Sequence, residues 1–86
     1  MQTQTNILNY RVIIQKEKKV YVAYAPALGI SDFGKTVDEA GKHIQEAIEC
    51  HINGLIKTGC DIPAPDSDEY IVSTMRVRVP VNIGFA

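Results

Sequence analysis

The sequence has few of the features that mark the more specialised classes of protein. It contains two cysteines, Cys50 and Cys60, and one bridge is too little for a disulfide-stabilised fold of this length. No apolar run approaches the roughly 18 residues of a membrane-spanning helix, and the polar N-terminal residues lack the apolar core of a signal peptide. These absences predict a cytoplasmic protein with reduced thiols and no membrane partner.

An excess of positive charge is also lacking. Nine basic and ten acidic residues give a net charge of −1. Proteins that bind nucleic acid usually carry a basic excess, because phosphate contacts dominate their affinity. The sequence therefore predicts no direct binding of nucleic acid.

The length leaves room for one small domain. A chain of 86 residues cannot hold two independent cores, so we expect one domain over residues 1–86, with residues 1–6 frayed. A core of this size barely offsets the conformational entropy lost on folding. Association of two or more copies is therefore expected.

Apolar and β-branched residues predict four strands, at residues 7–15, 19–25, 28–33 and 70–81. The four charged residues Lys16 to Lys19 predict a hairpin loop between the first two strands. In the second strand, alternation predicts two faces, one with Val20, Val22 and Tyr24 and the other with Tyr21, Ala23 and Ala25. The last predicted strand shows a similar alternation over residues 70–79.

One long helix is predicted between Thr36 and Gly59. Thr36 and Glu39 have the spacing of a capping box, and Gly59 suits a left-handed helix end. Apolar residues recur at three- and four-residue spacing and predict one buried stripe, formed by Val37, Ala40, Ile44, Ala47, Ile48, His51, Ile52, Leu55 and Ile56. The predicted fold is α+β, with the order β-β-β-α-β and one helix packed on a face of an antiparallel sheet.

A glycine-rich segment matches the spacing of a phosphate-binding loop. Gly29 and Gly34-Lys35-Thr36 fit the pattern Gly-x-x-x-x-Gly-Lys-Thr. Such a loop belongs to a larger parallel sheet with a separate acidic magnesium ligand. A turn followed by a helix cap is therefore the preferred interpretation, and no cofactor is predicted.

The titratable residues do not predict a catalytic or metal site. His43 and His51 are eight residues apart on the helix, about two turns, which is too far to chelate one ion. We expect His51 at the edge of the buried stripe and His43 at the surface. The acidic residues around the helix start are expected to cap the helix or face solvent, so no enzyme activity is predicted.

Two arginines mark the strongest candidate for a binding surface. Arg76 and Arg78 share one face of the last predicted strand with Tyr70, and arginine and tyrosine are enriched at protein interfaces. Together with Tyr24 they are the predicted partner-binding residues. The same arginines also fit an exposed, solubilising sheet face, and an edge strand here would also suit pairing with a second copy.

Five motifs occur in an order that resembles the HicB-like antitoxin family. The motifs are Tyr10-Arg11-Val12, Tyr21 to Leu28, Gly34 to Ala40, Glu46-Ala47-Ile48 and Gly59 to Pro65, and the resemblance extends over roughly residues 10 to 80. The resemblance implies a partial ribonuclease-H-like fold without catalytic carboxylates. It also implies a homodimer or higher homo-oligomer that binds a small HicA-like toxin and sterically blocks its cleavage of mRNA.

The resemblance leaves two alternatives open. Many relatives carry a C-terminal DNA-binding segment, and none is expected after the last predicted strand of this sequence. The first alternative is an oligomeric domain of the same fold with another partner. The second is a metal-dependent nuclease that uses Asp32 or the helix carboxylates.

Overall fold

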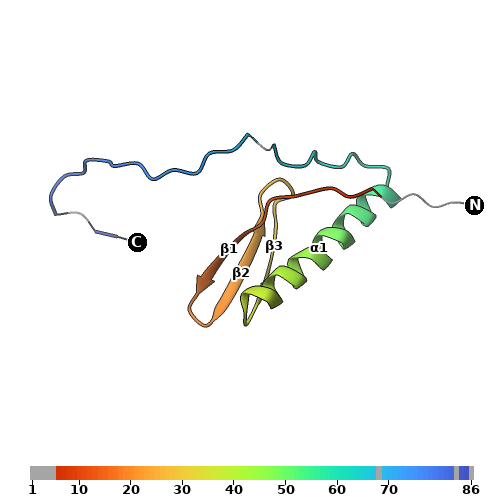
Figure 1. Cartoon of the computed structure of the whole chain (residues 1–86), viewed down its shortest axis with the longest axis horizontal. Coiled ribbons are helices and arrows are strands. Elements are labelled where there is room, and N and C mark those ends of the chain that lie inside the picture. Colours follow the sequence, from red (N-terminus) through yellow and green to blue (C-terminus); the bar gives the residue numbers. More distant parts are fainter. Residues whose placement is uncertain (1–5, 68, 83, 86) are drawn as a thin grey trace, which may run out of the picture.

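The chain forms a three-stranded antiparallel sheet followed by one long helix. The computed structural model describes residues 6–67, 69–82 and 84–85. The strands are β1 (Ile13–Glu17), β2 (Val20–Ala25) and β3 (Ile30–Gly34), in the spatial order β1-β2-β3. The helix α1 (Val37–Lys57) packs on one face of this sheet (Figure 1). This arrangement confirms the predicted α+β class and the position of the helix.

The first hairpin is tighter than predicted. β1 begins at Ile13, and Lys16 and Glu17, expected in the loop, extend it and pair with β2. The turn consists of Lys18 and Lys19, and Lys18 has a φ of 55°. Two-residue turns with positive φ match the twist of the flanking strands. Lys16 and Glu17 can belong to a strand because their charged side chains are exposed to solvent.

Alternation along β2 separates the two faces of the sheet as predicted. Ala23 and Ala25 are fully buried on the side that carries α1. Their small side chains allow the helix to approach closely, and Ala23 forms the core with Ala40 and Ile44 of α1. Partly buried residues surround this core, namely Val12, Ile14, Tyr21, Ile30 and Ile48. The described core is small, and most of the apolar stripe of α1 extends beyond it.

Both predicted ends of α1 are confirmed. Thr36 is the N-cap, and its Oγ1 accepts a hydrogen bond of 3.0 Å from the backbone N–H of Glu39. Thr58 ends the helix, and Gly59 follows with a φ of 71°. Three positions predicted in the buried stripe are exposed: Val37, His51 and Ile56. A 21-residue helix is about 32 Å long and a five-residue strand about 17 Å, so the sheet cannot cover the whole stripe.

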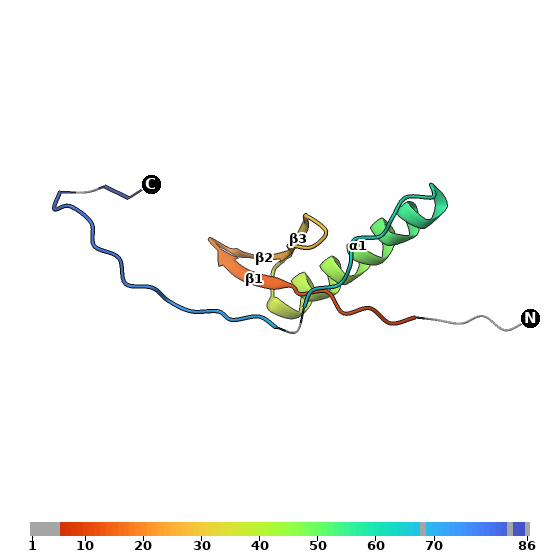
Figure 2. The same ribbon diagram turned by 90° about the horizontal axis from the view of Figure 1, so that it is seen from above.

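The prediction of a paired last strand is wrong for the described single chain. Residues 69–82 are extended, but none of them forms a strand with the sheet. Figures 1 and 2 show this part of the chain running away from the sheet in both views. The radius of gyration is 17.5 Å, whereas a compact domain of this length has about 12 Å. Alternation alone does not make a strand, because a ladder needs a second backbone.

The predicted order β-β-β-α-β is therefore observed only as β-β-β-α. The expected fraying of residues 1–6 falls outside the described residues, except at Asn6. Of the helices in the described part of the chain, none has the length and apolar character needed to cross a membrane.

Candidate functional site

One face of the sheet is largely apolar and is not covered by α1. The apolar residues of this open sheet face are Ile13, Val20, Val22, Tyr24 and Phe33, and Gln15, Glu17 and Ser31 share the face. In the strand register, Tyr24 lies between Ile13 and Ser31, and Val22 lies between Gln15 and Phe33. Tyr24 is 44% exposed and Phe33 is 61% exposed. An exposed aromatic and aliphatic cluster on a sheet is typical of a protein-binding surface.

The open sheet face is hollowed next to β3. Val20, Val22 and Phe33 line a shallow hollow of about 490 Å³ together with Ser31 and Asp32. Asp32 Oδ1 accepts a 2.8 Å hydrogen bond from the backbone N–H of Phe33. The hollow therefore combines an apolar floor with one carboxylate at its edge, which suits a partner that carries a basic side chain.

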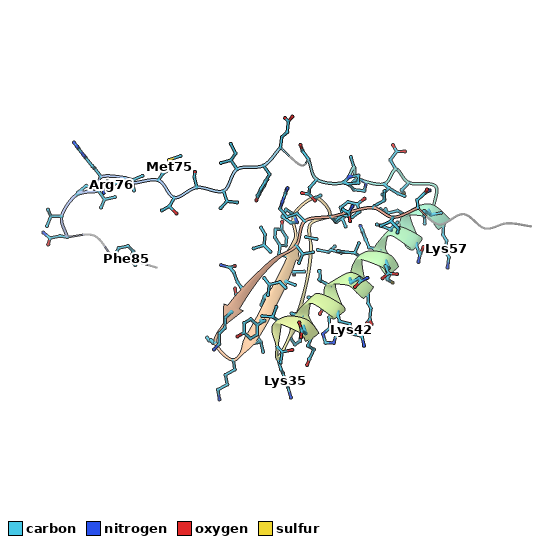
Figure 3. The ribbon with its side chains drawn as sticks, in the orientation of Figure 1. Lys35, Lys42, Lys57, Met75, Arg76 and Phe85 are labelled. Atoms are coloured by element: carbon cyan, nitrogen blue, oxygen red, sulfur yellow. The ribbon has the colours of Figure 1, made fainter. Side chains whose placement is uncertain are left out.

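The three predicted binding residues are not brought together in the single chain. Tyr24 lies on the open sheet face, in the middle of the sheet. Arg76 and Arg78 lie on the extended segment after residue 69 and are exposed. Figure 3 shows Arg76 far from the strands. Their predicted common face required the last strand to join the sheet, which it does not do here.

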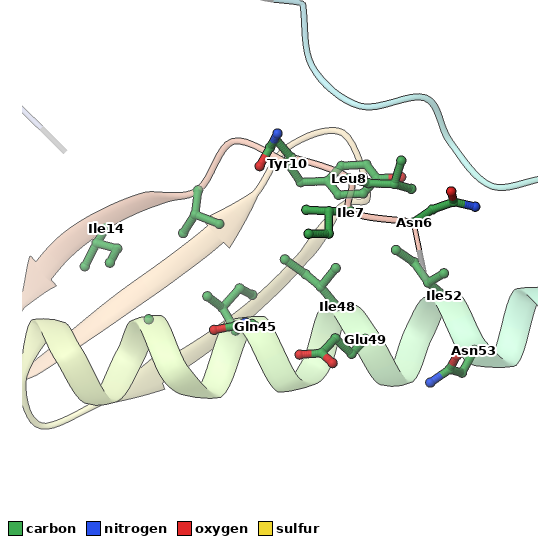
Figure 4. A pocket seen from close by; sticks show the side chains of 14 residues that line it. Asn6, Ile7, Leu8, Tyr10, Ile14, Gln45, Ile48, Glu49, Ile52 and Asn53 are labelled. Carbon is green, nitrogen blue, oxygen red and sulfur yellow. The ribbon is translucent and has the colours of Figure 1, made fainter. Parts of the chain in front are cut away.

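A second apolar surface lies between α1 and the segment that leads into β1. This helix groove has a volume of about 750 Å³. Its apolar walls are Ile7, Leu8, Val12 and Ile14 on one side and Ile44, Ile48 and Ile52 on the other. Ile48 and Ile52 project from α1 toward the N-terminal segment (Figure 4). The sequence pattern predicted the helix stripe, but not that Ile44, Ile48 and Ile52 would line an open groove.

The chain that leaves α1 is tied to the same N-terminal segment. The Arg11 backbone N–H donates to Asp66 Oδ2 over 2.7 Å, and Arg11 Nη1 lies 3.2 Å from Asp66 Oδ1. Arg11 Nη2 donates to the carbonyl of Ser67 over 2.9 Å, and the guanidinium stacks 3.4 Å from the ring centroid of Tyr70. The Tyr10 hydroxyl donates to the carbonyl of Pro63 over 2.6 Å. We call this set of contacts the Arg11 clamp.

His51 does not lie at the edge of the buried stripe as predicted, and His43, predicted at the surface, is partly shielded. His51 is exposed, whereas His43 is half-buried and its Nδ1 lies 2.7 Å from the carbonyl oxygen of Phe33. This hydrogen bond raises the pKa of His43 above 6.5, and nearby carboxylates, of which Glu39 is the strongest, act in the same direction. Burial lowers the pKa but does not outweigh them. His43 thereby links α1 to the strand that carries Phe33.

The glycine-rich segment does not form a phosphate-binding loop. Ile30–Gly34, the greater part of the motif, is the strand β3. Gly29, with a φ of 67°, belongs to the turn before it. Gly34 lies against the start of α1, where a Cβ would come within 2.5 Å of the backbone nitrogen of Ala40. The glycines thus serve a turn and a close strand-to-helix contact.

The acidic and sulfur-containing residues do not gather into a centre. Among the residues that the structure describes, no three His, Cys, Asp or Glu side chains are placed to hold a metal ion. Cys50 and Cys60 are both free and exposed. The features that remain available for function are therefore the two apolar surfaces and the extended segment.

Comparison with known proteins identifies the family. The family described as HicB_like antitoxin of bacterial toxin-antitoxin system matches residues 10–78. The UPF0150 protein ssr1765 of Synechocystis is 39% identical over 79 residues, which are 90% of this chain and 96% of that protein. The UPF0150 protein Ta0767 of Thermoplasma acidophilum is 40% identical over 67 residues, 76% of this chain and 97% of the relative. No solved structure matches the chain. The chain therefore belongs to the HicB-like antitoxin family.

Proposed function

We propose that this chain is an antitoxin module that binds a small HicA-like toxin and sterically blocks its cleavage of mRNA. It acts by covering the toxin and not by catalysis. The family match over residues 10–78 is the observation that carries this proposal. The proposal includes a cytoplasmic location and association into a homodimer or higher homo-oligomer. It also includes a partial ribonuclease-H-like fold, in which the last predicted strand joins β1, β2 and β3.

The open sheet face supports the proposal physically. It presents Tyr24 and Phe33 to solvent at 44% and 61% exposure, and α1 covers only the opposite face. Binding energy in protein interfaces is concentrated in a few aromatic and arginine anchors. We therefore place the toxin contact at Tyr24, with Arg76 and Arg78 as further contacts.

The direct test is co-purification with the product of the neighbouring gene. Tagged antitoxin is co-expressed with the small protein encoded beside it, and growth and complex formation are measured. We expect the chain to restore growth and to elute with the toxin as a stable complex. Absence of both growth rescue and a complex would contradict the proposal.

Variants of the open sheet face locate the contact. Tyr24→Glu introduces a charge into an apolar interface, so we expect at least a tenfold loss of affinity, since each 1.4 kcal/mol is tenfold. His51→Glu introduces the same charge at an exposed position of α1 and is the matched control. Both variants are first compared by circular dichroism to show that they fold. Equal affinities for the two variants would place the toxin elsewhere on the molecule.

A further inference from the structure

The described chain exposes an unpaired strand edge beside an apolar groove, and it also exposes an extended apolar segment that could cover them. Among the described residues, no strand pairs with the outer edge of β1 (Ile13–Glu17), so its backbone hydrogen-bonding groups are unpaired on that side. The helix groove lies along the same edge and leaves Ile48 and Ile52 partly exposed. An unprotected edge beside an apolar groove is a site for strand addition.

The segment after residue 69 has the pattern that this site requires. One face of the segment is apolar apart from Ser73 and consists of Ile71, Ser73, Met75, Val77 and Val79. Ile71 is 90% exposed, and the segment is already extended. Figure 1 shows that it extends away from its own sheet. A soluble protein rarely exposes a continuous apolar face of this length without a partner.

We propose that residues 70–79 of one copy add as a strand to the β1 edge of a second copy. The apolar face of the segment then fills the helix groove of that copy. Because both copies carry the same edge and the same segment, the exchange is reciprocal and closes a two-fold symmetric dimer. The inference rests on the self-association proposed above and does not depend on the identity of the toxin.

The Arg11 clamp indicates the direction of the added strand. Tyr10 contacts Pro63 and Arg11 contacts Asp66, so the two segments advance in the same direction. Tyr70 stacks on Arg11 of its own copy. If the exchanged strand keeps this pairing between copies, with Tyr70 of one beside Arg11 of the other, a parallel strand brings Arg76 next to Glu17. In the exchanged dimer this register pairs the arginine of one copy with the glutamate of the other.

The exchange also completes the predicted partner-binding face. When the apolar face of the added strand lies against the groove, its other face joins the open sheet face, because side chains alternate across a sheet. Arg76 and Arg78 of one copy then lie on the same surface as Tyr24 of the second copy. The three predicted residues, which are separate in the described single chain, form one surface in the dimer.

A mixed-label experiment distinguishes exchange from closure within one chain. Full-length protein labelled at methionine methyls is unfolded and refolded with an equal amount of protein labelled at isoleucine methyls. We expect a mass of twice 9.5 kDa by light scattering. We also expect nuclear Overhauser contacts from Met75 to isoleucines of the helix groove, such as Ile44, which can arise only between copies. A monomer at all concentrations, or a dimer without these contacts, overturns the proposal.

A pair of neighbouring variants tests which face of the segment is used. Met75→Asp places a charge on the groove-facing side, and we expect at least a tenfold weaker dimer. Thr74→Asp places the same charge on the opposite side and serves as the matched control. If Met75→Asp and Thr74→Asp weaken the dimer equally, or neither does, the proposed orientation is wrong. A toxin complex that forms while the dimer is absent also contradicts the exchange, and it leaves the antitoxin function intact.

Discussion

Arg11 and Asp66 form a two-point contact across 55 residues of sequence. The Asp66 carboxylate accepts from the Arg11 backbone N–H over 2.7 Å and lies 3.2 Å from the Arg11 guanidinium. Both side chains are partly shielded, with 25% and 14% exposure. The contact fixes where the chain that leaves α1 meets the segment before β1, and so it sets the starting point of the extended segment.

We predict that Asp66→Ala lowers the free energy of unfolding by about 1–2 kcal/mol, because it removes a charge-assisted hydrogen bond and leaves a backbone donor without its partner. Urea denaturation measures the change. Asp61→Ala removes an exposed acid from the same segment and is the control, with an expected change under about 0.5 kcal/mol. Equal effects of the two substitutions would show that the Arg11 contact does not stabilise the fold.

Gly34 permits a close approach of β3 to α1. A methyl group there would lie 2.5 Å from the nitrogen of Ala40 and 2.8 Å from the carbonyl carbon of Glu39, both rigid backbone atoms. Gly34→Ala should therefore destabilise the protein by about 1–3 kcal/mol. The control is Gly54→Ala, since a Cβ at Gly54 meets nothing within 4 Å and alanine favours a helix interior by roughly 0.5–1 kcal/mol. Thermal melts of both variants should shift in opposite directions.

Thr36 supplies the side-chain cap of α1. Its Oγ1 accepts the N–H of Glu39 over 3.0 Å, so Thr36→Ala should cost about 1 kcal/mol. Thr36→Ser keeps the hydroxyl and should stay close to the parent protein in chemical denaturation. A serine variant as unstable as the alanine variant would assign the effect to the lost methyl group and not to the cap.

The features predicted correctly from the sequence are those set by near neighbours along the chain. The cap at Thr36 depends on a residue three positions away, and the faces of β2 depend on alternation alone. The cap and the two faces of β2 could therefore be predicted without knowing the rest of the fold. The same holds for the helix end at Gly59, where a positive φ favours glycine.

The features that were missed depend on contacts between distant segments. The last strand was predicted from its alternation, but a strand also needs a partner backbone, which the single chain does not provide to residues 69–82. Nothing local to Arg11 indicates that it contacts Asp66. His51 was predicted at the edge of the buried stripe but is exposed, because the helical stripe is longer than the sheet that covers it. Tyr24, Arg76 and Arg78 were predicted to form one binding surface on the assumption that the last strand pairs with the sheet, so they are separate in the single chain.

His43 gives the stability of the fold a defined dependence on pH. The hydrogen bond to the Phe33 carbonyl and the carboxylate of Glu39 raise its pKa in the folded protein above 6.5. The folded state therefore binds the proton more tightly than the unfolded state does. The contribution of protonated His43 to stability is fully present below pH 6.5, the ordinary pKa of histidine, and is lost as the pH rises through the pKa of the folded protein.

We predict that the difference in unfolding free energy between the parent protein and His43→Gln is larger at pH 5.5 than at pH 8. Urea denaturation of both proteins at the two pH values measures this difference, and subtraction removes the contributions of other titrating groups. Glutamine is uncharged at both pH values and retains a donor toward Phe33. A difference that stays constant, or grows toward pH 8, would show that protonated His43 does not stabilise the contact between α1 and β3.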